Sequence, residues 1–379
     1  MKKTNIIFAG ILLVLLGLSC KKEKELEECP VTPEAEAKIP EFYGNNPIGS
    51  STPNYTVVAN SVNLVNSPQD LDFHPAPSRK GELWILNEGT SNTGSSTIII
   101  SNAGKSSQSS IYRKDGNSWH FMSLGTALAF SPENYNFGTS SGIYDANQDG
   151  GNPFAGPSLW SSDMSIYAQY AGPGTNGSHL DMLHESPYSM GIAHEKDNIF
   201  WVFDGNSSQI VKYDFKGDHG PGMHDHSDGE VERYIGFTVT RKASVPSHMV
   251  IDKTSNWLYI CDTGGKRILR MRINTGTKKR DLPLLYEALA SRKEMENPEW
   301  EVFSDINLTD PCGVEVKDGR LFVSDNATNE IIAYNIGTKK EMARIRTNAT
   351  SIKGIKIGPD GKLWYVDYSA NNVVRVDPR

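Results

Sequence analysis

Histidine and carboxylate side chains gather in residues 177–195 of this chain of 379 residues. The stretch reads GSHLDMLHESPYSMGIAHE, and its chemically competent side chains are His179, Asp181, His184, Glu185 and Tyr188. Imidazole and carboxylate groups together suit zinc or another divalent transition metal. Without a metal, the same groups are able to serve as general acid and base. The alternative is a polar loop whose histidines cap turns or stack on the tyrosine.

A second histidine-rich stretch, residues 217–230, reads GDHGPGMHDHSDGE. A Gly-rich turn in which histidine and aspartate alternate has the composition of a metal-binding loop. Its candidate ligands are His219, His224 and His226. A solvated loop with incidental histidines is the alternative, and the sequence alone leaves both open.

A third candidate is a calcium loop that begins at Asp145. Oxygen-bearing side chains occupy its first, third and fifth positions, namely Asp145, Asn147 and Asp149, and a glycine follows for the turn. The twelfth position is Gly156 rather than glutamate. No helices are predicted beside the loop, so it is not a complete EF-hand. An Asx-rich turn explains the same residues and is favoured.

The elements that must position these residues come from a repeat. Copies of one block span residues 189–215, 247–273, 311–336 and 352–378. Each holds an apolar strand, a short turn and a second apolar strand that closes on an acid, namely Asp204, Asp262, Asp325 and Asp367, spaced 58, 63 and 42 residues apart. One such meander cannot bury both of its faces, so it must pack on a neighbour. A ring of them leaves only short, protected edges.

Two weaker copies lie upstream and bring the expected number of blades to six. Residues 68–100 form one copy, with Asn87 in place of the closing aspartate. Residues 124–139 supply the inner strand of the other, and residues 162–170 are expected to supply its later strands. Residues 54–65 are a spare strand that completes the last blade and closes the ring.

The order of residues within the blocks resembles the NHL-repeat six-bladed β-propeller. Glycine stands before apolar residues, Gly-x-Leu-apolar-Val-x-Asp follows, and apolar pairs come after Asn or Arg. The resemblance covers residues 55–379 and implies an all-β fold, a six-bladed β-propeller. It is specific for the fold and unspecific for function. The one helix we expect, residues 283–295, falls in a loop between blades.

Propeller geometry, as the resemblance implies it, sorts residues by face. The loop before each inner strand and the loop after each second strand lie on the top face, where ligands usually meet the central channel. The inner strands are expected to start near Gln69, Thr126, Met190, His248, Cys312 and Lys353. His179 to Tyr188 then enter the third blade from the top, whereas His194 lies toward the bottom. This placement disfavours a His179–His184–His194 triad.

His248 comes from the next blade and joins the top loop in this scheme. The expected metal ligands are therefore His179, Asp181, His184 and His248, and the catalytic candidates are His179, His184, Glu185, Tyr188 and His248. The 217–230 stretch is expected on the bottom face, between the third and fourth strands of its blade. A similar propeller, the peptidylglycine amidating lyase, binds zinc through histidines from several blades. Here only His248 matches, because its equivalents are Met190, Cys312 and Lys353.

Two functions follow as expectations, beside a third alternative, a scaffold that binds metal only on its bottom face. The first is a propeller that binds a small molecule, glycan or protein through its top-face funnel, with a bound divalent metal such as zinc or calcium as an option. The second is a metal-dependent lyase or hydrolase, amidating-lyase-like or lactonase-like, that acts at the central channel. Lactonases use Glu, Asn and Asp in the channel, and the ring of closing Asp and Asn residues imitates that set.

The first residues have the pattern of a lipoprotein signal peptide, residues 1–19. Two lysines precede an apolar run from Ile6 to Leu18, and Leu-Gly-Leu-Ser-Cys then resembles a bacterial lipobox that ends at Cys20. Cys20 is expected to carry the lipid, and residues 20–54 to form a flexible linker that tethers the domain to the cell outer membrane. An ordinary signal peptide with a chance cysteine is the alternative.

The formal net charge is −7, and the sequence shows no stripe of basic residues, which argues against nucleic acid as a partner.

Of the cysteines other than Cys20, Cys261 ends the second strand of one blade and Cys312 begins the inner strand of the next. Adjacent inner positions lie within disulfide reach, and an exported protein permits the bond. A disulfide between Cys261 and Cys312 is therefore one expectation, and two buried thiols are the alternative.

Overall fold

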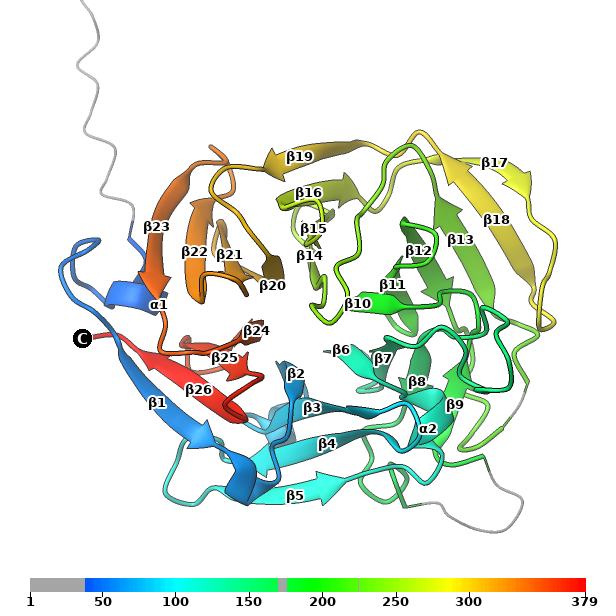
Figure 1. Cartoon of the computed structure of the whole chain (residues 1–379), viewed down its shortest axis with the longest axis horizontal. Coiled ribbons are helices and arrows are strands. Elements are labelled where there is room, and N and C mark those ends of the chain that lie inside the picture. Colours follow the sequence, from blue (N-terminus) through cyan, green and yellow to red (C-terminus); the bar gives the residue numbers. More distant parts are fainter. Residues whose placement is uncertain (1–37, 170–175, 224) are drawn as a thin grey trace, which may run out of the picture. The chain divides into compact units, whose positions relative to one another are not determined.

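The computed structural model describes residues 38–169, 176–223 and 225–379, which contain six sheets arranged around a common centre (Figure 1). The first blade consists of β2 (Pro68–Phe73), β3 (Leu83–Thr90), β4 (Gly94–Ser101) and β5 (Ser109–Arg113). The second consists of β6 (Gly125–Phe130), β7 (Phe137–Ser141), β8 (Ser158–Trp160) and β9 (His179–Met182). The third consists of β10 (Ser189–Lys196), β11 (Ile199–Asp204), β12 (Gln209–Asp214) and β13 (Glu230–Tyr234).

The second half of the ring follows the same plan. The fourth blade consists of β14 (Met249–Asp252), β15 (Trp257–Asp262), β16 (Arg267–Arg272) and β19 (Trp300–Ser304). The fifth consists of β20 (Pro311–Lys317), β21 (Arg320–Asp325), β22 (Glu330–Asn335) and β23 (Glu341–Arg346). The sixth consists of β24 (Ile352–Ile357), β25 (Leu363–Asp367), β26 (Asn372–Asp377) and β1 (Asn54–Ala59). The expected six-bladed β-propeller is thus confirmed.

The ring is closed by the strand we expected. β1 pairs with β26 in antiparallel register, Asn54 opposite Asp377 and Val57 opposite Val374. The outer strand of the sixth blade therefore comes from the start of the domain and its other strands from the end. This pairing joins the two ends of the described chain, so no blade is left with an open edge at the seam.

Four buried acids hold the upper face together, by which we mean the face that carries the loops before each inner strand and after each second strand. Asp262 accepts hydrogen bonds from Thr240 N at 2.6 Å and Gly265 N at 3.1 Å. Asp325 and Asp367 bind their own entering loops in the same way, while Asp204 bonds its own turn and pairs with Arg233. These carboxylates are turn caps, as the position of three of them before Gly, Thr or Asn predicts.

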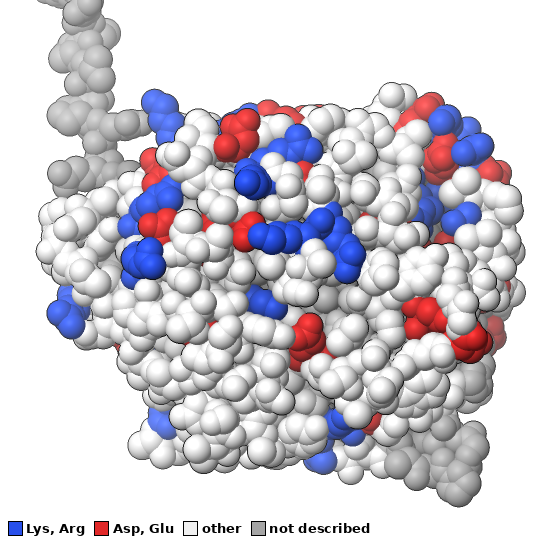
Figure 2. Space-filling model, in the orientation of Figure 1, with Lys and Arg blue, Asp and Glu red and all other residues white. Residues whose placement is uncertain are grey.

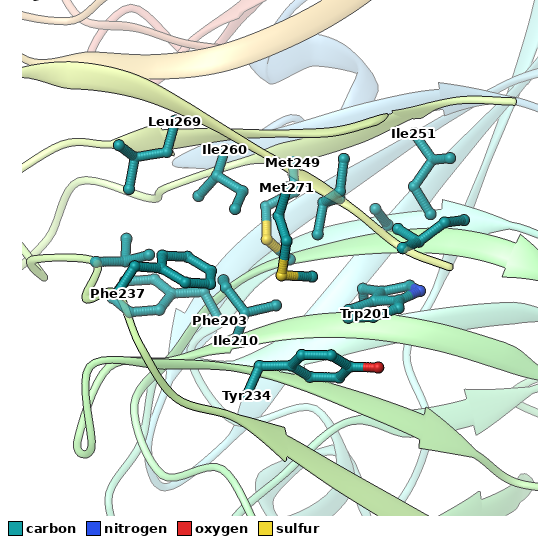
Figure 3. Packing of buried hydrophobic residues seen from close by; sticks show 14 of the residues in the cluster. Trp201, Phe203, Ile210, Tyr234, Phe237, Met249, Ile251, Ile260, Leu269 and Met271 are labelled. Atoms are coloured by element: carbon teal, nitrogen blue, oxygen red, sulfur yellow. The ribbon is translucent and has the colours of Figure 1, made fainter. Parts of the chain in front are cut away.

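Apolar side chains fill the spaces between neighbouring blades. Between the third and fourth blades they come from both sheets, and Trp201, Leu269 and Met271 are fully buried (Figure 3). The repeat's glycines let the inner strands come close. A Cβ on Gly191 would lie 2.1 Å from Ser247 O, so a larger residue there would force the third and fourth blades apart.

Three details of the fold differ from the expectation. Residues 283–295 are not a helix, because β18 (Ser291–Glu296) pairs with β17 (Thr277–Asp281) and runs parallel to β13, which widens the third blade to six strands. Residues 162–169 form no strand of the second blade, whose outer strands are β8 and β9. Two four-residue α-helices occur within the described residues, α1 (Pro40–Tyr43) and α2 (Ser118–Phe121).

Residues 38–54, which were predicted to belong to the linker of residues 20–54, are part of the compact unit. Ile39, Phe42 and Tyr43 pack into the core between the fifth and sixth blades, and Glu41 pairs with Arg320 at 2.8 Å. The compact unit therefore begins at Lys38 instead of residue 55. The signal peptide, Cys20 and the first part of the linker lie outside the described residues. Within the described part, no helix is long and apolar enough to span a bilayer.

Candidate functional site

A cavity of about 360 Å³ occupies the centre of the ring. All six inner strands line it, and so do residues of the loops that join first to second strands. Pro132 and Lys253 in those loops are exposed. The cavity therefore opens on the lower face, which carries the loops between first and second and between third and fourth strands.

The upper end of the channel is closed. The residues at the starts of the six inner strands are at most 5% exposed, namely Gln69, Thr126, Met190, His248, Cys312 and Lys353. Lys353 Nζ donates to Gln69 Oε1 at 2.9 Å and to the carbonyl of Ser244 at 3.0 Å, in the loop before β14. Burial lowers the pKa of Lys353 to about 8. The top-face funnel that we expected at the channel is thus replaced by a lower-face cavity.

One lysine organises the charge in the cavity. Lys356 Nζ lies 3.3 Å from Asp72 Oδ1 and 3.1 Å from Glu315 Oε2, so one cation links three blades. Burial alone would lower the pKa of Lys356, but these two carboxylates outweigh it and leave the pKa raised. Burial raises the pKa of Glu315. Removing the lysine would leave two carboxylates without their cation in a low-dielectric site, which is costly.

The acids of β2 also bind the neighbouring blade. Asp70 Oδ2 accepts from the N–H of Leu128 at 3.0 Å, and Asp72 Oδ2 accepts from the N–H of Phe130 at 3.2 Å. These amides lie on the inner edge strand of the second blade, so the carboxylates satisfy donors that have no strand partner there. Burial raises the pKa of Asp70, although His248 and the two backbone donors oppose the rise.

A neutral histidine stands at the lower mouth. His194 Nε2 donates to the carbonyl of Asp197 at 3.0 Å, and His194 Nδ1 accepts from Lys253 Nζ at 3.1 Å. Burial, helped by the Lys253 charge, lowers the pKa of His194 to about 4. The cavity thus offers carboxylates, ammonium groups and an imidazole, with Phe130 and Val250 among its apolar walls. Such a lining suits a small polar molecule that has both donors and acceptors.

His248 stands at the deep end of this cavity, apart from the other predicted ligands. Its Nε2 donates to the Thr126 carbonyl at 2.9 Å, and its Nδ1 lies 3.7 Å from Asp70 Oδ1. His179 and Asp181 lie on β9, the outermost strand of the second blade, and His184 follows it. His248 is therefore not brought together with His179, Asp181 and His184, and the predicted four-ligand group does not form. The prediction failed because 179–182 is an outer strand and not part of a loop at the channel.

The remaining catalytic candidates have structural contacts. Glu185 Oε2 accepts from Arg292 Nε at 2.7 Å, and burial raises the pKa of this carboxyl. The ring of Tyr188 is covered by the guanidinium of Arg241, 4.1 Å from the ring centre. Both side chains fasten the connection between the second and third blades.

The other predicted ligands lie on two loops. Asp145 accepts from the N–H groups of Asn147 at 2.9 Å, Asp149 at 3.3 Å and Gly151 at 3.1 Å, so it forms the favoured Asx-type turn. In the loop from Phe215 to Gly229, His219 pairs with Asp228 at 2.9 Å, and His226 binds Asp181. His224 lies outside the described residues. This loop joins the third and fourth strands, as expected.

The cysteine prediction is wrong. Cys261 and Cys312 are buried free thiols, and the Cys261 thiol lies 3.7 Å from the carbonyl oxygen of Gly313. Burial raises the pKa of both thiols.

On the face shown in Figure 2, basic and acidic side chains are interspersed, with no continuous basic stripe.

Sequence reasoning missed most of the channel groups, namely Asp70, Asp72, Lys253, Glu315 and Lys356. A signal was present, because Asp70 and Asp72 alternate with apolar residues in the first blade's inner strand. Successive residues of a strand point to opposite sides, so the two acids share a side. Charged groups at such positions in inner strands indicate a polar channel.

Comparison with known proteins identifies the fold class. No protein-family model and no curated protein matches the chain. An auxiliary nutrient binding protein from Bacteroides thetaiotaomicron matches with a TM-score of 0.54 and 12% identity, over 82% of this chain and 68% of that one. Another auxiliary nutrient binding protein, from Bacteroides ovatus, matches with a TM-score of 0.53 and 11% identity, over 89% of this chain and 76% of that one. A catalytically inactive variant of virginiamycin B lyase from Staphylococcus aureus, with quinupristin, matches with a TM-score of 0.50 and 13% identity, over 86% of this chain and 88% of that one. At these identities the likeness shows the propeller fold alone.

The buried histidine at the mouth predicts a pH dependence. Because the folded-state pKa of His194 is depressed, its neutral ring contributes stability above pH 6.5 that is lost as the pH falls toward 4. The loss through this group is on the order of 3 kcal/mol. His194→Gln keeps a donor and an acceptor but does not titrate. Its free energy of unfolding, measured by urea titration, should therefore change less between pH 7 and pH 4 than that of the wild type. Identical slopes for variant and wild type would contradict the assignment.

Proposed function

We propose that this chain is a cell-envelope β-propeller that binds a small polar molecule in the lower-face channel cavity. The observation that carries the proposal is the cavity itself. Its volume of about 360 Å³ lies near the small end of the range typical of ligand sites, and charged groups of both signs converge in it. A molecule of the size of an amino acid or a monosaccharide, with both donors and acceptors, suits these walls.

The comparisons agree with a binding role. Two of the matching propellers, both from Bacteroides, are described as auxiliary nutrient binding proteins. The lyase alternative depended on His248 as a channel ligand, and both nitrogens of that ring face protein groups instead. Within the described residues, no three His, Cys, Asp or Glu side chains already stand together at coordinating distance. Binding without catalysis is therefore the function we favour at the channel.

The ligand prediction centres on Lys356. We expect an amino acid or a monosaccharide from a defined panel to raise the melting temperature of the protein and to bind in calorimetry. Lys356→Met should weaken that binding at least about tenfold, or ~1.4 kcal/mol, because the central cation of the cavity is lost. Lys362→Met is the matched control, since Lys362 pairs with Asp377 on the last blade away from the cavity.

Two results would overturn the ligand proposal. One is a panel in which no compound binds or shifts the melting temperature. The other is equal affinity for Lys356→Met and the wild type. Because Lys356→Met leaves Asp72 and Glu315 unpaired, its folding is checked first by circular dichroism. Val250→Phe, which narrows the cavity without a change in charge, serves as the second variant.

We also propose that a lipid on Cys20 anchors the domain to the outer membrane. The support is the lipobox-like Leu-Gly-Leu-Ser-Cys after a short apolar run. Cys20→Ala should move the protein from the membrane fraction to the soluble fraction, and metabolic labelling with a palmitate analogue should disappear. A Cys20→Ala protein that stays in the membrane fraction would refute the anchor.

A further inference from the structure

Four histidines from distant parts of the chain line a second cavity, at the rim of the ring near the outer strand of the second blade. The cavity has a volume of about 280 Å³, and its histidines are His120, His179, His184 and His226. His120 belongs to α2, before the second blade, and His226 belongs to the 215–229 loop of the third blade. This rim cavity shares no lining residue with the channel cavity.

The Nδ1 atoms of these rings all face acceptors. The contacts are His120 with the Ala146 carbonyl at 3.1 Å, His179 with the Asn176 carbonyl at 2.8 Å, His184 with Glu287 Oε2 at 2.8 Å, and His226 with Asp181 Oδ1. Carbonyl and carboxylate oxygens only accept, so each Nδ1 carries a proton. In a neutral ring this leaves Nε2 as the basic nitrogen. Histidines that bind metals are oriented by the same kind of outer partner.

Two of the Nε2 atoms face each other. His120 Nε2 and His184 Nε2 are 3.4 Å apart. If both rings are neutral, two lone pairs meet at this distance, which is unfavourable unless a cation lies between them. Two nitrogen ligands at 2.0–2.1 Å from a tetrahedral zinc ion are separated by roughly 3.3 Å. The pair therefore already has the spacing of two zinc ligands.

The surroundings hold the rings in place and supply negative charge. Phe154 stacks on His184 with ring centres 3.8 Å apart. The ring of His226 is 6.1 Å from that of His184 and nearly perpendicular to it. The partner carboxylate Asp181 is fully buried, and its Oδ2 has no hydrogen-bond partner in the structure. Asp181 and Glu287 together would balance the charge of a divalent ion.

We propose that this rim cavity is a zinc site in which His120, His184 and His226 are the protein ligands. Imidazole nitrogens suit zinc and, among related ions, copper and nickel. His120 and His184 are already at ligand spacing, and His226 is the third ligand, with its ring centre 6.1 Å from that of His184. His179 adjoins the site and fixes its floor by stacking on Phe121 at 3.5 Å.

The proposed ion has a structural purpose. The outer edge of the second blade is weak, because β8 and β9 contain only three and four residues. An ion bound to His120, His184 and His226 would tie the entry to the second blade, its outer edge and the third blade's long loop. This inference is independent of the channel proposal, since the two cavities have different linings.

The test uses the full chain, treated with chelator and then titrated with zinc chloride in a calorimeter. We expect one zinc ion per chain, a raised melting temperature, and tetrahedral d–d absorption when cobalt(II) replaces zinc. His184→Ala and His226→Ala should each weaken binding at least about 100-fold, and Glu287→Gln about 10- to 100-fold, as an outer partner does. His219→Ala is the matched control on the same loop and should bind as the wild type does.

Three outcomes would overturn the proposal. The first is no zinc binding by the wild-type chain. The second is zinc binding that persists in both His184→Ala and His226→Ala. The third is equal loss in the His219→Ala control. Because His226 pairs with the buried Asp181, the folding of its variant, like that of His184→Ala, is checked first by circular dichroism.

Discussion

The structure depends on one constraint: an isolated four-stranded meander with two apolar faces would expose both faces to water and is therefore not stable by itself. Each blade buries both faces only if it has a neighbour on each side, so the array must close on itself. Closure is achieved by β1, which completes the sixth blade from the opposite end of the domain. The apolar layers between blades, such as that around Trp201 and Leu269, then form one cluster between each pair of neighbouring blades. The helix at residues 40–43 adds to one of these layers.

Closure also decides where chemistry is available. Inner strands are edge strands, and their free amides must be satisfied inside the ring. Asp70 and Asp72 do this for the second blade, and Lys356 balances the charges of Asp72 and Glu315. At the upper end Lys353, Gln69 and the loop before β14 close the channel. The polar groups that remain accessible within the channel are therefore those of its lower end. Other polar cavities lie outside the channel, one beside the loops before β2 and after β3, and one at the rim, where the second blade's outer strands are short.

The repeat made most of the architecture predictable from the sequence. Blade number, the closing strand and the turn-capping role of the aspartates follow from local patterns and burial. The helix predicted at residues 283–295 failed because pairing with β13 outweighs a weak helical preference. The sites were less predictable, because they are formed by contacts between residues that lie far apart in the sequence. Nothing near His120 or His226 indicates that both approach His184. Nor does the loop before β14 reveal that its Ser244 carbonyl covers Lys353.

Thiol accessibility tests directly whether the channel is closed at its upper end and open at its lower end. In a chain in which Cys20, Cys29 and Cys261 are replaced by serine, native Cys312 reports on the upper end of the channel and Val250→Cys on the cavity. The account predicts that a small maleimide modifies Val250→Cys in the folded protein, while Cys312 reacts only after unfolding in urea. Modification of Cys312 as fast as Val250→Cys, or protection of both, would contradict it.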